Sequence, residues 1–210
     1  MVKRLFLGLL VVITVAVSEL EALSIETINE AYYTSYALEK AEDYSRAIEA
    51  LSPIYEVYPN SYTINFRFGW LRYLQGHFAD ALAHYRKALA IYPASVEVMS
   101  CISLVHKDRF DWTKVEEENS KILKIDNFNK TANYWYAYAL KSQKKHKQAQ
   151  SVCMKMLTIY PTDVTFLFLM GKIMFEVGNA EKSLYYFGSV ITLDPYNTGA
   201  KEYIAKLIEN

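Results

Sequence analysis

The sequence predicts an all-α protein built from stacked pairs of helices, and three observations lead to this fold class. A short phrase returns at a fixed period of thirty-four positions, five times in succession and without an insertion or deletion. Between these phrases, apolar residues recur at the i, i+3 and i+4 spacing of amphipathic helices. Strand signals are missing, because the chain has no alternating β-branched runs and no Asn-Gly or Asp-Gly hairpin dipeptides.

The N-terminal residues, 1–23, are predicted to be a secretory signal peptide or an N-terminal anchor. Lys3 and Arg4 precede thirteen apolar or weakly polar residues, Leu5 to Val17, and small residues stand at Ala16 and Ser18. The apolar stretch is shorter than the ~20 residues that span a bilayer as a helix. We therefore expect cleavage and export to the periplasm or to an extracellular or lumenal space. The alternative is an uncleaved signal that anchors the protein in the membrane.

The repeating phrase marks the end of each helix pair. Proline cannot continue a helix and restrains the residue before it, so it is expected to close the second helix of a unit. The central residues of the phrase are Pro59, Pro93, Asn127, Pro161 and Pro195.

Small residues obey the same period, as expected where two helix backbones approach closely. One set is Ala47, Ala81, Val115, Ala149 and Ser183, and the other is Ser35, Gly69, Ser103, Ala137 and Gly171.

These residues resemble the tetratricopeptide repeat (TPR), a helix–turn–helix unit of the same period. The resemblance is carried by Gly69, Ala81, Tyr85, Ala88 and Pro93, and again by Gly171, Phe187 and Pro195. It implies a right-handed superhelical solenoid. The third repeat departs from the pattern at Val115, Asn119 and Asn127, and the fourth places Cys153 where an aromatic residue is usual. We interpret Cys101 and Cys153 as structural thiols.

The domain organisation that follows has a repeat region at residues 24–197 and a C-terminal helix at 198–210. The five repeats are expected at about 28–61, 62–95, 96–129, 130–163 and 164–197. In the last segment Ala200, Tyr203, Ile204 and Leu207 form one apolar stripe. Such a helix is expected to cap the end of a repeat array.

The resemblance also implies a concave groove lined mainly by the first helix of each repeat. Large rings gather at the implied groove positions in two zones, with smaller residues at Ser100, Cys101 and Leu104 between them. Tyr136 is expected in the core, and some of the rings are expected to be structural. The candidate partner-binding residues are Tyr32, Tyr33, Tyr36, Phe66, Arg67, Trp70, Tyr73, Tyr134, Trp135, Tyr138, Phe168 and Phe175.

Composition and motifs exclude several other classes of function. The 23 basic and 23 acidic residues balance, whereas proteins that bind nucleic acid usually carry a basic excess. The four histidines lack metal-ligand spacing, and no catalytic motif is present. We expect no enzyme activity, no metal and no cofactor. The basic run at 141–147 is expected to be a solvated turn, and the groove positions are too aromatic for a carboxylate clamp.

The sequence therefore predicts a non-enzymatic scaffold or adaptor that binds a protein partner. A peptide or helix of the partner would lie in the aromatic groove, and the protein would serve complex assembly outside the cytoplasm. The alternatives are a membrane-anchored assembly factor, associated with the membrane through the N-terminal apolar segment, and a glycan-binding protein that stacks sugars on the rings.

Overall fold

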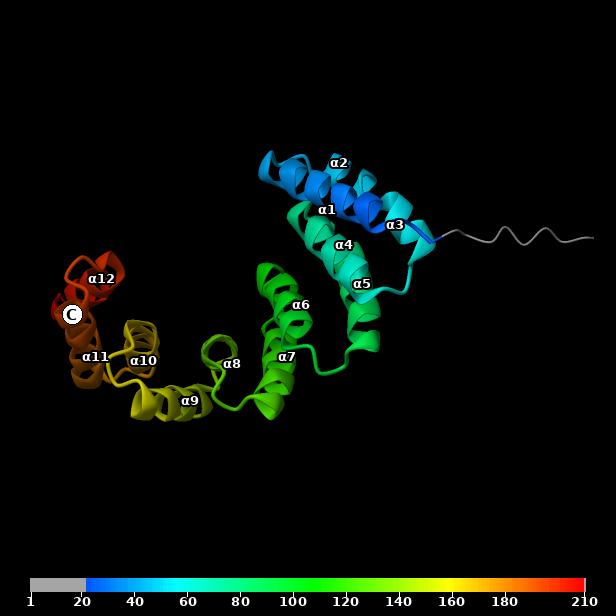
Figure 1. Ribbon diagram of the computed structural model, residues 1–210. Coiled ribbons are helices and arrows are strands. Elements are labelled where there is room, and N and C mark those ends of the chain that lie inside the picture. The colour runs from blue at the N-terminus through cyan, green and yellow to red at the C-terminus, as the bar shows by residue number, and fades with distance from the viewer. Residues whose placement is uncertain (1–21, 210) are drawn as a thin grey trace, which may run out of the picture.

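The computed structural model describes residues 22–209, so the predicted signal segment lies outside the described residues except at its last two positions. Twelve helices and no strands make up the described part of the chain, which confirms the all-α prediction (Figure 1). The first helices of the repeats are α1 (Ile25–Lys40), α4 (Tyr62–Leu74), α6 (Val96–Asp108), α8 (Lys130–Ser142) and α10 (Val164–Glu176). The second helices are α2 (Tyr44–Glu49) with α3 (Ser52–Val57), α5 (Phe78–Ile91), α7 (Trp112–Ile125), α9 (His146–Ile159) and α11 (Ala180–Leu193), and α12 (Thr198–Ile208) follows.

The helices keep the period of the sequence. From α4 onward every first helix begins one full period after the one before it, and α12 begins one full period after α10. Helix α12 thus takes the place that the first helix of a further repeat would take. Each helix packs on its neighbours in chain order, as in other solenoids. The chain bends into an arch, and α8 and α10 lie on its inner side while α9 and α11 lie outside (Figure 1).

The second helix of the first repeat departs from the expected single helix. It is split into α2 and α3 at Ala50 and Leu51. Pro53 lies in the first turn of α3, where it has no N–H to donate to the carbonyl of Glu49, and its ring would clash with that carbonyl in a continuous helix. Leu51 is fully buried at the break, so the split helix still contributes to the core.

The closest approach of two helices within a repeat depends on residue size. A Cβ atom built on Gly69 would lie 2.5 Å from Cδ1 of the buried Tyr85 ring, and one built on Gly171 would lie 2.7 Å from Phe187. The two residues of each pair are sixteen positions apart in the sequence. In the other repeats the same spacing joins a larger residue on the first helix to a smaller residue on the second helix. The positions in register are Ser35 with Leu51, Gly69 with Tyr85, Ser103 with Asn119, Ala137 with Cys153 and Gly171 with Phe187. The combined volume of the two side chains fills the space between the helices, so neither residue has to be of one fixed size.

The turn inside each repeat contains one residue in the left-handed region, and these residues recur with the same period. They are Glu42, Gly76, Phe110, Lys144 and Gly178, with φ between 57° and 77°. Glycine adopts this conformation without strain, whereas a side chain there costs roughly 1–2 kcal/mol. Three of the five turns therefore carry strain that the sequence pattern did not indicate.

Changing the sizes of the two residues at one helix crossing tests whether their combined volume determines the packing. Gly69→Ala is expected to lower the free energy of unfolding by about 1–3 kcal/mol, because the ring of Tyr85 has no space to retreat. Gly69→Ala with Tyr85→Cys reproduces the pair of the fourth repeat and is expected to show a favourable coupling of about 1–2 kcal/mol. Urea unfolding of the four proteins measures the cycle; strictly additive effects would contradict the rule.

Relief of a left-handed side chain is expected to stabilise the fold. Glu42 is exposed and makes no ion pair among the described residues, so Glu42→Gly is expected to raise stability by about 1 kcal/mol. Gly178→Ala is the reverse change in the fifth repeat and is expected to lower stability by a similar amount. Thermal unfolding of both variants checks the two signs, and a loss of stability in Glu42→Gly would refute the assignment.

Candidate functional site on the concave face

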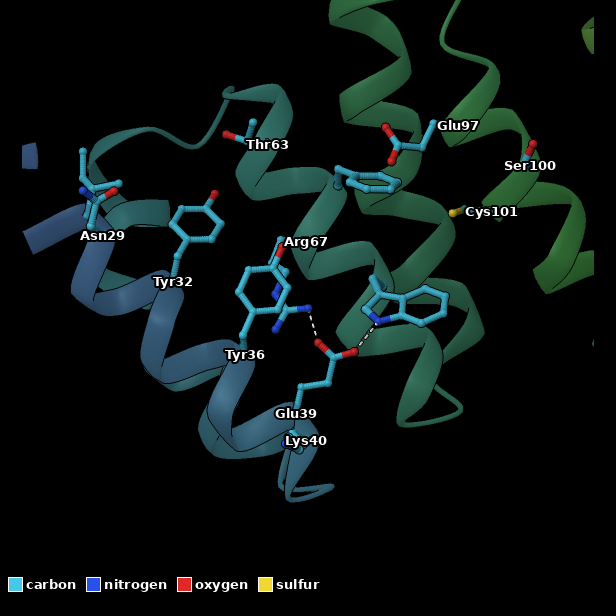
Figure 2. Close-up of a pocket in the computed structure, with 13 residues that line it drawn as sticks. Asn29, Tyr32, Tyr36, Glu39, Lys40, Thr63, Arg67, Glu97, Ser100 and Cys101 are labelled. Carbon is cyan, nitrogen blue, oxygen red and sulfur yellow. Dashed lines mark hydrogen bonds and ion pairs between the residues drawn. The ribbon is translucent and has the colours of Figure 1, made fainter.

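Two adjoining hollows open on the face formed by the first helices. The larger, which we call the groove cavity, has a volume of about 980 Å³ and is lined only by residues of α1, α4 and α6 (Figure 2). The smaller, the central cavity, has a volume of about 220 Å³ and lies mainly between α6 and α8. Ser100 and Cys101 belong to both hollows, so the two cavities form one continuous depression.

The carboxylate of Glu39 organises the wall of the groove cavity. The indole nitrogen of Trp70 donates a hydrogen bond to Oε1 at 2.7 Å, and the guanidinium of Arg67 pairs with Oε2 (Figure 2). Arg67 also donates to the hydroxyl of Ser35 at 3.1 Å, and its guanidinium carbon lies 3.9 Å from the centre of the Tyr36 ring. These contacts join α1 to α4 and fix the orientation of both rings.

Four rings face the groove cavity. Tyr36 is 56% exposed, while Tyr32, Phe66 and Trp70 are half-buried. Burial raises the pKa of the Tyr32 hydroxyl, so the group stays protonated and uncharged at neutral pH. The Nε atom of Arg67 is buried and has no hydrogen-bond partner among the described residues. The cavity therefore offers mainly apolar contact surface, and the guanidinium of Arg67 is engaged by the protein's own Glu39 and Ser35.

The central cavity is bordered by a smaller polar network. Lys107 pairs with Asp108 at 2.8 Å and lies 5.4 Å from the ring centre of Trp135. Tyr73 donates its hydroxyl to Asp108 at 2.5 Å. Burial favours the neutral form of Asp108, but the hydrogen bonds from Lys107 and Tyr73 outweigh it and hold the pKa of this carboxyl below its ordinary value. Asp108 is thus ionised at neutral pH, and Lys107 is not an isolated cation.

The structure brings only part of the predicted site together. The groove cavity is lined by five of the candidates, Tyr32, Tyr36, Phe66, Arg67 and Trp70, and the central cavity by Trp135. Arg67 is only 5% exposed and is paired with Glu39, so it is part of the wall more than an accessible contact. Tyr73 packs on Trp70, and Tyr138 packs between Trp112 and Trp135.

The remaining candidates lie outside both hollows. Tyr33 is 79% exposed, and Tyr134 packs against the core around Phe166. Phe168 and Phe175 both contact Tyr203 of α12, because α12 takes the place of a further first helix and covers these rings. The second aromatic zone is therefore largely packing surface. Tyr136, expected in the core, contacts that core but is only half-buried.

The candidate list named only aromatic residues and Arg67, so it left out the polar residues that line the groove cavity. Asn29, Thr63 and Glu97 occupy the same position of three successive repeats, and all three line the cavity. Their shared position in the repeat was the sequence signal that could have identified them. The role of Glu39 depends on Arg67 and Trp70 in the next repeat, and no local pattern marks it.

The described residues include no helix that combines the length and apolar character needed to cross a bilayer. Within the same part of the chain, no group of three or more His, Cys, Asp or Glu side chains is placed to hold a metal ion. Both cysteines are free thiols; Cys153 is buried, and burial raises the pKa of Cys101.

Comparison with known proteins identifies the repeats. Two family models described as tetratricopeptide repeat match residues 35–96 and 131–163. A tetratricopeptide repeat protein from Parabacteroides merdae ATCC 43184 is similar in structure, with a TM-score of 0.80 and 18% identity over 88% of this chain and 73% of that chain. No curated protein sequence matches the chain.

Two further solved structures are similar. YrrB, described as a TPR protein with an unusual peptide-binding site, has a TM-score of 0.71 and 16% identity over 88% of this chain and 92% of that chain. MamA from Desulfovibrio magneticus RS-1, from residue 41 to its end, has a TM-score of 0.74 and 12% identity over 84% of this chain and 99% of that chain. At these identities the likeness establishes the fold.

Removing one partner of the Arg67–Glu39 pair tests its role in the wall. Glu39→Leu leaves the guanidinium buried without its carboxylate and is expected to lower stability by about 3 kcal/mol. Glu39→Leu with Arg67→Met removes both charges and is expected to recover most of that loss. Urea unfolding compares the two variants. If the double variant is no more stable than the single one, the pair is not what holds α1 against α4.

Proposed function

Because the chain is a tetratricopeptide repeat protein, we propose that it is a non-enzymatic interaction scaffold that holds a segment of a partner protein in the groove cavity. We further propose that it works outside the cytoplasm, where it helps to assemble a larger complex. The observation that carries the proposal is the groove cavity itself, an open hollow of about 980 Å³ with four rings on its walls.

The rings offer enough apolar surface for specific binding. A fully covered ring buries ~150–250 Å², which corresponds to an upper limit of roughly 4–6 kcal/mol at ~25 cal/mol per Å². Association costs ~4–15 kcal/mol, so engagement of three or four partly exposed rings suits micromolar affinity. Since Glu39 holds Trp70 and Arg67 in place, little ordering of the wall is needed when a partner binds.

The polar atoms of the groove cavity favour a polypeptide ligand. Asn29, Thr63 and Glu97 are exposed polar side chains that line the groove cavity, and the carboxylate of Glu97 is an acceptor for a backbone or side-chain donor of the partner. Glycan binding has less support, because both oxygens of Glu39 are already engaged by the protein itself. The alternative of a membrane-anchored assembly factor differs only in whether residues 1–23 are retained.

Two rings of the same helix provide a matched test of the groove. Tyr36 lines the groove cavity, whereas Tyr33 is more exposed and lies outside it. Tyr36→Ala with Trp70→Ala is expected to reduce crosslinks from α1, α4 and α6 to partner polypeptides at least tenfold in native cells. Tyr33→Ala is expected to leave them unchanged. Crosslinking mass spectrometry reads both, and equal crosslinking of the double variant and the wild type would rule out the groove as the binding site.

A further inference from the structure

A second surface of the solenoid is unusually apolar. We call it the inter-repeat edge; it comprises the turns that follow α3, α5, α7, α9 and α11, with the adjoining helix ends and the start of α1. Among the described residues, nine of the sixteen exposed large apolar side chains lie on this edge. They are Ile25, Ile91, Tyr92, Ile125, Phe128, Ile159, Tyr160, Leu193 and Tyr196.

The opposite edge provides the comparison. It is formed by the turns inside the repeats, and its exposed large apolar side chains among the described residues are Phe110 and Val177. Its other turn positions include Glu42, Gly76 and Lys144. Both edges consist of turns and helix ends, but they differ in the number of exposed large apolar side chains. A contiguous exposed apolar surface of this kind typically marks a site of interaction.

Contacts join successive turns of the inter-repeat edge at two places. The Tyr62 hydroxyl lies 2.9 Å from the hydroxyl of Ser95, and its ring packs edge-on against Tyr92 with centroids 5.0 Å apart. Further along, Lys130 pairs with Asp163 and lies 5.6 Å from the ring centre of Tyr160. A hollow of about 450 Å³ opens between Tyr62 and the turn at 92–95.

The polar groups of the edge suit a lipid surface better than water alone. The ammonium nitrogen of Lys155 lies 5.8 Å from the Phe128 ring centre and donates a hydrogen bond to the backbone carbonyl of Asn127. Two carboxylates of the edge are engaged by the protein, because Asp163 accepts from the backbone of Thr165 and Phe166 and Asp194 accepts from the backbone of Tyr196. Glu26 and Glu56 on the same edge are exposed. Tyrosines with nearby lysines are typical of the belt where a protein meets lipid headgroups.

The described chain also enters the fold at this edge. Leu23 packs against the same core cluster as Tyr58, and the start of α1 lies beside the end of α3 (Figure 1). Five residue steps separate Ala22 from Val17, the last residue of the apolar stretch. At ~3.4 Å per residue the two ends are at most ~17 Å apart. A bilayer that holds residues 5–17 therefore lies within reach of the edge, at a high effective concentration.

We propose that the inter-repeat edge rests on the lipid bilayer in which residues 5–17 are inserted. Most of the groove-cavity lining lies on the sides of the first helices, and Thr63 and Glu97 lie at the helix starts beside the edge. The proposal concerns the form of the protein that keeps residues 1–23, and it does not depend on what the groove binds.

Tryptophan fluorescence in vesicles of brominated phosphatidylcholine tests this contact. Bromine quenches only an indole at the bilayer. In the full-length chain, Tyr196→Trp and Tyr160→Trp introduce an indole on the edge, and Tyr185→Trp places a matched one on α11, where Tyr185 is 67% exposed. The fluorescence added at 196 and 160 is expected to fall at least twofold relative to unbrominated vesicles. The fluorescence added at 185 is expected to remain unchanged.

Three outcomes would overturn the proposal. A chain that does not float with the vesicles has no anchor, and equal quenching at 185 and 196 means unspecific adsorption. If the chain floats with the vesicles but the indoles at 160 and 196 are not quenched, the edge does not contact lipid and is a surface for a protein partner. None of these outcomes bears on the groove, because crosslinks lost in Tyr36→Ala with Trp70→Ala are read separately. That double variant is expected to keep the quenching at 196.

Discussion

The close crossing of the two helices in each repeat is the constraint on which the rest of the structure depends. Gly69 leaves room for the ring of Tyr85, and Gly171 leaves room for Phe187. Where the first residue is larger, as at Ala137, the second is smaller, as at Cys153. Because interiors are close-packed, this exchange of volume keeps every helix pair at one spacing although the residues differ. Equal pairs then stack regularly, and the starts of the first helices keep one constant period from α4 to α12.

The regular array turns one side of every first helix toward the inside of the arch, but neighbouring repeats use that side differently. Near the N-terminus, Glu39 binds Arg67 and Trp70 across a repeat boundary, and the rings around them remain partly open. Near the C-terminus, Phe168 and Phe175 pack on Tyr203, so α12 converts groove positions into core. The concave face of this solenoid is thus open near the N-terminus and covered near the C-terminus.

The same array has two chemically different surfaces. The groove cavity uses the sides of α1, α4 and α6, whereas the inter-repeat edge uses helix ends and turns. The fold alone does not decide either role, since helix-repeat arrays serve many functions. The side chains proposed to carry the two roles include Trp70 in the groove and Tyr196 on the edge.

The sequence by itself determined the all-α class, the length of the repeating unit and the columns of residues that share a face, because helix periodicity and proline placement are local properties. It also led to five of the groove-cavity residues. Only the tertiary structure decided which rings are covered, that Arg67 is paired with the carboxylate of Glu39 in the preceding repeat, and that the second helix of the first repeat is split. The reason is that coverage and pairing depend on the side chain that the next repeat supplies. A period predicts where that side chain stands, but its size and charge decide whether it fills, pairs with or leaves open the space beside it.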